Sequence, residues 1–186
     1  MKSFFISFIS FSILSASTWQ NIQSPTETQT ILNVQSGSLE HSVVEFNIDG
    51  FHLIPVQTPE GEMYLVRLED GASLLETGSP DMHKYARSIV IPDDEQMAIK
   101  ILSSDYIEYE NVLIAPSKGN LSRLIDPSYV EYEFGPVYQK DDFFPGNLVD
   151  LEDPYILRDV RGQSIVFHPF QYDPVQKNRV ILIVAV

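Results

Sequence analysis

Proline and glycine interrupt the second half of this chain so often that a long helix cannot form there. Between residues 111 and 174 the sequence consists of short apolar and aromatic runs separated by turn-forming residues, and no long window shows a sustained helical stripe. This pattern is typical of short β-strands joined by tight turns. We therefore predict an all-β fold, a single antiparallel β-sandwich of the jelly-roll kind, formed by residues 31–186.

Several strands and turns of this fold can be placed individually. Asp49-Gly50 predicts a hairpin turn between strands at residues 42–48 and 51–54, and residues 59–62 predict a second turn before a strand at 63–68. Further strands are expected at residues 97–102, at 106–114 and at the end of the chain, from 179 to 186. Only residues 81–87 suggest a helical turn, and a short one.

The N-terminus has the features of a signal peptide. Lys2 supplies a positive charge, residues 4–16 are apolar apart from serines, and Ser15, Ala16 and Ser17 offer small side chains for cleavage. The apolar run is too short to span a bilayer as a helix. We expect residues 1–17 to be removed, with cleavage near Ser17 and a mature chain that begins near Thr18. Residues 18–30, rich in Gln, Thr, Ser and Asn, predict a mobile leader.

Composition excludes several functions. With 26 Asp and Glu against 12 Lys and Arg the net charge is −14, which disfavours nucleic acid and anionic membrane surfaces as partners. The chain has no cysteine, so it has no disulfide and no thiol nucleophile. The sequence presents no catalytic constellation, and we expect neither enzymatic activity nor a cofactor in this chain.

Most polar residues are interpreted as structural. The four histidines are scattered without metal-ligand spacing, and the acidic residues between 141 and 153 suit a solvated face better than a calcium site, so we expect no metal. Arg158, Asp159 and Arg161 lie beside Gly162 and predict an ion-pair cluster that pins a strand end, with contact to a protein partner as the alternative.

Residues 117–127 are the exception. Lys118, Gly119 and Asn120 have turn chemistry, and Asp126-Pro127 closes the segment with a restricted backbone. Between them, Arg123 is the one arginine, flanked by Leu121, Ser122, Leu124 and Ile125. The pattern predicts an exposed loop that presents a guanidinium among apolar side chains.

Four ordered phrases resemble the propeptide of gingipain-type cysteine proteases. They are VLIAPSKG at residues 112–119, FFPG at 143–146, PYILRDVRGQ at 154–163 and QYDPV at 171–175, with a looser match, RSIVIP, at 87–92. The resemblance covers most of the chain after about residue 78, while the first fifty residues match only loosely. It implies a domain that keeps its protease latent and assists its folding, and the catalytic cysteine would then lie on sequence outside this chain.

The resemblance also implies a role for the loop. Such a propeptide blocks its enzyme with a substrate-like segment, so Arg123 is expected to fill the specificity pocket of an arginine-selective partner, with Lys118 as a rival anchor. The Arg123–Leu124 bond, preceded by Ser122, would be the bond that the mature enzyme cuts. By resemblance, export would pass through the periplasm to the cell surface by the type IX route. Two alternatives stay open: a stand-alone secreted inhibitor, and a β-sandwich adhesion or carbohydrate-binding module.

Overall fold

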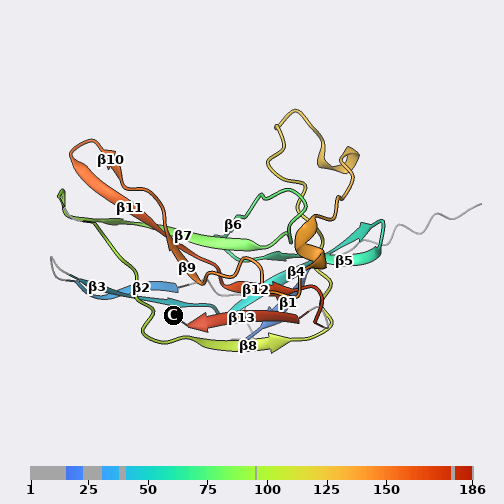
Figure 1. Cartoon of the computed structure of the whole chain (residues 1–186), viewed down its shortest axis with the longest axis horizontal. Helices are drawn as coiled ribbons and strands as arrows, with labels where there is room; N and C mark the ends of the chain where they lie inside the picture. Colours follow the sequence, from blue (N-terminus) through green and yellow to red (C-terminus); the bar gives the residue numbers. More distant parts are fainter. Residues whose placement is uncertain (1–15, 23–30, 38–40, 95, 177–178, 186) are drawn as a thin grey trace, which may run out of the picture.

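The computed structural model describes residues 16–22, 31–37, 41–94, 96–176 and 179–185, and this part of the chain is all-β (Figure 1). Its strands are β1 (Thr18–Asn21), β2 (Ile31–Gly37), β3 (Ser42–Asn47), β4 (Gly50–Thr58), β5 (Gly61–Arg67), β6 (Ala72–Ser73), β7 (His83–Val90), β8 (Asp105–Tyr109), β9 (Val149–Leu151), β10 (Tyr155–Leu157), β11 (Val160–Phe167), β12 (Phe170–Asp173) and β13 (Arg179–Ala185). Two 3-10 turns, η1 (Pro127–Tyr129) and η2 (Pro136–Gln139), are the only helical elements among the described residues. The all-β prediction is confirmed, and the helical turn expected at residues 81–87 is wrong, since β7 occupies most of it.

The strands form three antiparallel sheets. The first has the order β1-β4-β5, the second β10-β11-β7-β6 with β9 also on β11, and the third β12-β13-β3-β2 with β8 also on β13. Figure 1 shows β7, β9 and β11 in a layer above β2, β3, β8 and β13. None of the segments that the structure describes is a helix with the length and hydropathy needed to span a bilayer.

The turn expected at Asp49-Gly50 does not form a hairpin. Strand β3 pairs with β2 and β13, whereas β4 pairs with β1 and β5, so the chain passes from one sheet to another between them. Ile48 and Phe51 on either side are buried in the core, and a side chain at Gly50 would collide with the Trp19 ring. Burial of Ile48 and Phe51 therefore decides which strands pair here. The second expected turn, at residues 59–62, does connect a hairpin, formed by β4 and β5.

The expected boundaries differ from the structure in three places. Residues 18–21, expected in the mobile leader, form β1 and pair with β4 from Thr18↔Leu53 to Asn21↔Gly50. Residues 97–102 form no strand, and the strand expected at 106–114 ends at Tyr109. The closing strand is present as β13, between β12 and β8. Residues 1–15 and 23–30, which hold most of the expected signal peptide and leader, lie outside the described residues.

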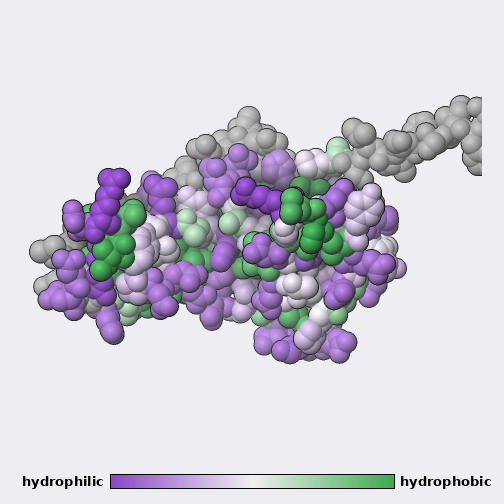
Figure 2. All heavy atoms as spheres, turned by 90° about the horizontal axis from the view of Figure 1, so that it is seen from above, coloured by the Kyte–Doolittle hydropathy of each residue, from purple (hydrophilic) through white to green (hydrophobic). Residues whose placement is uncertain are grey.

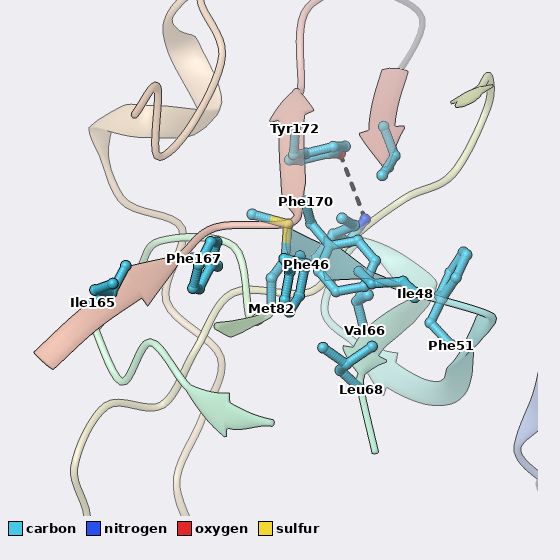
Figure 3. Close-up of a cluster of buried hydrophobic side chains, with 12 residues drawn as sticks. Phe46, Ile48, Phe51, Val66, Leu68, Met82, Ile165, Phe167, Phe170 and Tyr172 are labelled. Carbon is cyan, nitrogen blue, oxygen red and sulfur yellow. Dashed lines mark hydrogen bonds between the residues drawn. The ribbon is translucent and has the colours of Figure 1, made fainter. Parts of the chain in front are cut away.

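Aromatic side chains from different sheets meet in one core (Figure 3). Phe46 of β3 stacks on Phe167 of β11 with ring centroids 4.7 Å apart, and Phe51 of β4 meets the edge of Phe170 of β12 at 5.3 Å. Tyr172 of β12 is fully buried, and its hydroxyl accepts a long 3.5 Å hydrogen bond from the Ile114 backbone nitrogen. Burial raises the pKa of Tyr172 to about 12, so its hydroxyl stays neutral. The core therefore joins all three sheets to the segment that precedes the loop.

His168 is buried next to this core with one ring nitrogen lacking a partner. Its Nε2 lies 3.0 Å from Oδ2 of Asp150, while Nδ1 has no hydrogen-bond partner. Burial, helped by Lys84, lowers the pKa of His168 below its usual 6.5, although Asp150 and Glu152 act in the opposite direction. The folded chain therefore favours a neutral ring that donates from Nε2 to the carboxylate.

This arrangement predicts acid sensitivity. Because folded His168 takes up a proton less readily than the unfolded chain, its contribution to stability is complete above about pH 6.5 and is lost as the pH falls below that value, with a slope of at most about 1.4 kcal/mol per pH unit. Urea unfolding at several pH values should show that the free energy of unfolding depends less steeply on pH for His168→Gln than for the wild type, since glutamine keeps an N–H donor and does not titrate. Identical slopes for the two proteins would contradict the prediction.

Candidate functional site

The base of the expected loop is an extended segment inserted beside β5. Tyr64 donates its backbone N–H to the Leu113 carbonyl (2.7 Å) and accepts from Ala115 (2.9 Å), in a parallel bridge. On the other side, the Ala115 carbonyl accepts from Asp81, and the Ser117 nitrogen donates to the Ser79 carbonyl at 2.7 Å. Residues 114–117 are buried. The phrase that carried the family resemblance therefore forms a fixed platform from which the loop departs.

An ion pair holds the neighbouring strand of this platform. Arg67 of β5 binds the Asp81 carboxylate through both terminal nitrogens, with Nη1–Oδ1 and Nη2–Oδ2 distances of 2.9 Å. The two side chains are largely buried, and Arg67 Nη1 also donates to the Asp81 carbonyl at 3.2 Å. Two parallel charge-assisted bonds fix both position and orientation. Asp81 is thereby held where its backbone can bind Ala115.

Gly78 joins the two ends of the loop. Its nitrogen donates to the Ser117 carbonyl, and its carbonyl accepts from the Gly135 nitrogen, both at 2.9 Å. Gly78 has φ +78°, and an added Cβ would come within 3.1 Å of that nitrogen, so this position needs glycine. Residues 118–134 therefore leave and return at one point, as in an Ω-loop. Figure 1 shows this excursion above β4 and η2.

Lys118 holds the loop together from within. Its Nζ donates to the Pro127 carbonyl at 2.8 Å and lies 4.0 Å from the centroid of the Tyr132 ring. The Asp126 carboxylate accepts from the Ser128 nitrogen at 2.9 Å and caps η1. This hydrogen bond is the main reason that the pKa of Asp126 is lowered, with the Ser128 hydroxyl and the nearby Lys118 acting in the same direction. The middle of the loop is thus a folded unit.

The tip of the loop presents Arg123 to solvent. Ile125 donates its N–H to the Ser122 carbonyl at 2.9 Å, which makes residues 122–125 a β-turn with Arg123 and Leu124 at its centre. Leu124 is 95% exposed, and Arg123 is exposed with no hydrogen bond or ion pair to any other described residue. The tip of the loop therefore exposes a guanidinium and an apolar side chain next to each other.

The face that bears the loop carries a second apolar region. Figure 2 shows this face from above, with apolar side chains gathered near the loop and, at the opposite end, near the β10–β11 hairpin. The exposed apolar and aromatic residues of the hairpin and of the end of β7 beside it are Val90, Tyr155, Ile156, Leu157 and Val160. The loop and the hairpin therefore both present apolar side chains on the face seen in Figure 2.

The second predicted cluster lies at this hairpin. Arg158 and Asp159 form its exposed two-residue turn, between the paired residues Leu157 and Val160. Arg161 donates from Nη1 to the backbone carbonyls of Pro92 (2.7 Å) and Asp93 (3.0 Å). Arg161 thus pins the end of β7 through carbonyl oxygens, and the ion-pair cluster of the three residues stays a prediction.

The loop was predicted from the sequence, whereas the residues that fix it were not. Gly78, Tyr132 and Gly135 are not among the predicted site residues, although Gly78-Ser79-Pro80 and Gly135-Pro136 are turn signals that frame the loop. Tyr138 of η2 was also missed: its hydroxyl donates to the Ile114 carbonyl at 2.9 Å. In the described part of the chain, no group of three or more His, Asp or Glu side chains is placed to hold a metal ion.

Comparisons with known proteins identify the family. The Propeptide_C25 family model matches residues 21–185. Gingipain R1 of Porphyromonas gingivalis is 43% identical over 135 residues, which are 73% of this chain and 14% of that protein. Gingipain R2 of the same species is 41% identical over 137 residues, or 74% of this chain and 19% of that protein. The chain thus spans less than a fifth of the length of these curated relatives.

Two solved structures share the fold. A complex of the RgpB pro- and mature domains of Porphyromonas gingivalis matches with a TM-score of 0.79 and 36% identity, over 83% of this chain and 80% of that one. A structure addressing the zymogenic latency of gingipain K from the same species matches with a TM-score of 0.73 and 22% identity, over 91% of this chain and 94% of that one. The chain belongs to the Propeptide_C25 family and is a propeptide of the gingipain type.

Proposed function

We propose that this propeptide keeps a gingipain-type cysteine protease latent by placing Arg123 in the specificity pocket of that enzyme. The observation that carries the proposal is the unpaired, exposed guanidinium of Arg123 at the tip of a loop whose ends are fixed at Gly78. A carboxylate at the base of an arginine-selective pocket would bind the planar guanidinium through two hydrogen bonds. A loop already fixed before binding loses little conformational entropy on binding, which favours affinity.

Lys118 is the weaker candidate for the pocket. Its ammonium group is engaged by the Pro127 carbonyl and the Tyr132 ring, and both contacts would be lost if the side chain entered a protease pocket. Arg123 loses no such contact. Leu124, next to Arg123 in the turn, supplies apolar surface that would pack against the walls of the cleft.

The catalytic chemistry would belong to the partner. The chain contains no cysteine, so a cysteine nucleophile must come from the protease domain. The RgpB structure similar to this chain is a complex of pro- and mature domains, which supports a catalytic domain as the partner. A propeptide encoded by its own gene would inhibit the protease in the same way as one fused to the catalytic domain. The sequence downstream of this chain distinguishes the stand-alone inhibitor from the fused precursor.

The adhesion or carbohydrate-binding alternative loses support from the surface. A flat platform for sugars needs several exposed aromatic rings side by side. In the described chain the tyrosines with the most exposed surface are Tyr106, Tyr129 and Tyr155, and they lie on β8, η1 and β10, three different parts of the molecule. We therefore retain the latency function.

We also infer that the two five-stranded sheets pack as a β-sandwich. Phe46 of β3 and Phe167 of β11 stack across the two layers, as inward-facing residues of such a fold do. The strands form three separate sheets, and their order in these sheets does not support the jelly-roll connection expected from the sequence. The propeptide domain would begin at β1, with Thr18, because that strand completes the sheet of β4 and β5.

Export would remove the N-terminal segment near Ser17. The first strand begins at Thr18, so cleavage there would leave the fold intact. We propose that the propeptide passes through the periplasm to the cell surface by the type IX route together with the protease. On this route it would also assist the folding of the protease. N-terminal sequencing of the exported protein should give a first residue within a few positions of Thr18, and a chain that keeps Met1 would overturn the assignment.

The direct test is inhibition. Titrating the mature RgpB domain with the purified propeptide should abolish hydrolysis of a small arginine substrate at near-stoichiometric ratio, competitively with that substrate. Full activity of the protease at a large excess of propeptide would overturn the proposed function.

A further inference from the structure

We infer that the β-turn at residues 122–125 and the Lys118–Pro127 hydrogen bond make this loop a slowly cut inhibitor instead of a good substrate. The inference rests on the proposed function and assigns to Lys118 the role of a positioning residue. It concerns how the expected substrate-like segment resists cleavage by the enzyme that it blocks.

The turn is the first obstacle to cleavage. A protease holds its substrate with an extended backbone, so that the carbonyl of the bond to be cut faces the nucleophile. In this loop the Arg123–Leu124 peptide bond is the central bond of the turn closed by Ser122 and Ile125. The Leu124 nitrogen, which would become the leaving amine, also faces the Ser122 hydroxyl oxygen at 3.4 Å. The side chain of Arg123 can fill a pocket while its peptide bond stays out of productive geometry.

Lys118 is the second obstacle, because it bridges the cleavage site. It lies before the Arg123–Leu124 bond and binds the carbonyl of Pro127, which lies after it. Gly78 joins Ser117 and Gly135 in the same way further out. Opening the turn into an extended strand would lengthen the path between Lys118 and Pro127 and pull this contact apart.

The same contacts would act after the bond is cut. Hydrolysis adds one water across the Arg123–Leu124 bond and leaves a carboxylate on Arg123 and an amine on Leu124. With Lys118 bound to Pro127, the new amine stays near the new carboxyl end, so the reverse reaction competes with release. The propeptide would then leave the enzyme only when the loop as a whole unfolds.

The experiment separates binding from cleavage by the mature RgpB domain. Lys118→Met keeps the aliphatic stem and removes the ammonium donor, whereas Lys118→Arg keeps a cationic donor. Ile125→Pro removes the N–H that closes the turn and biases Leu124 toward an extended backbone, at a half-exposed position. The matched control is Lys100→Met, an exposed lysine outside the loop. Cleavage is followed by mass spectrometry at saturating propeptide, and inhibition constants are measured with a small arginine substrate.

We expect Lys118→Met and Ile125→Pro to be cut after Arg123 at least about ten-fold faster than the wild type, with a smaller change in the inhibition constant. Lys118→Arg should recover most of the resistance, and Lys100→Met should match the wild type. The melting temperatures of all variants should stay close to one another, because the loop lies outside the core.

Two results would overturn the inference while leaving the proposed function intact. One is cleavage of both loop variants within about two-fold of the wild-type rate, with inhibition through Arg123 preserved. The other is faster cleavage that also spreads to exposed arginines elsewhere, such as Arg87 and Arg158, with a lowered melting temperature, because general unfolding would explain it. If the wild-type propeptide does not inhibit at all, the proposed function fails first and the inference fails with it.

Discussion

Arg123→Ala should weaken binding of this propeptide to an arginine-selective gingipain-type protease by about 2–5 kcal/mol, or roughly 30- to 5000-fold in the inhibition constant. The substitution removes a charge-assisted pair and leaves the acid of the pocket unmatched in a desolvated site. It should leave the propeptide itself unchanged, because Arg123 makes no hydrogen bond or ion pair with the other described residues. Competitive inhibition assays with the mature RgpB domain would measure the effect.

A graded series sharpens this prediction. Arg123→Glu should bind more weakly than Arg123→Ala, since it brings two negative charges together, and Arg123→Lys should be intermediate, since it keeps the charge without the planar fork. Arg87→Ala, on the exposed side of β7, is the matched control and should inhibit like the wild type. If the wild type and Arg123→Ala inhibit equally, and the wild type is not cut after Arg123, then either Lys118 fills the specificity pocket or the loop has no part in inhibition.

Phe46→Ala should destabilise the propeptide by about 3–5 kcal/mol. Phe46 is 1% exposed, stacks on Phe167 at 4.7 Å and contacts Tyr85, so its removal leaves a cavity between two sheets that cannot easily close. For a domain of this size the melting temperature should fall by about 6–20 °C. Thermal unfolding followed by circular dichroism would measure it.

Tyr129→Ala is the control for this second prediction. Tyr129 is an aromatic residue of the loop that is 86% exposed, and its replacement should change the free energy of unfolding by less than about 0.5 kcal/mol. If Phe46→Ala and Tyr129→Ala had equal melting temperatures, the core between β3 and β11 would not hold the sheets together as described.

Local chemistry accounts for the features that the sequence predicted correctly. The frequent Pro and Gly residues between 111 and 174 exclude long helices, and β-branched and aromatic runs favour strands, so the all-β class follows from the sequence. The turn at residues 59–62 connects the neighbouring strands β4 and β5, which pair with each other directly beside the turn, at Thr58 and Gly61. The exposed loop around Arg123 follows from turn residues on both of its sides.

Contacts between residues distant in the sequence decided the rest. Asp49-Gly50 has hairpin chemistry, yet β3 pairs with β2 and β13 and β4 pairs with β1 and β5, because burying Ile48 and Phe51 outweighs a local preference. The polar stretch at Thr18–Asn21 becomes β1 because β4 offers it a free edge.

For the site, the sequence determined that an arginine would stand on an exposed loop, while the tertiary structure determined how that loop is held. Gly78 binds both ends of the loop, Ser117 and Gly135, from far away along the chain, and Lys118 reaches Pro127 across the bond expected to be cut. A turn preference concerns the backbone of about four residues, whereas these contacts exist only once β5, the segment around Asp81 and residues 112–117 have packed together. That packing is the physical reason that the loop conformation could not be predicted from the sequence alone.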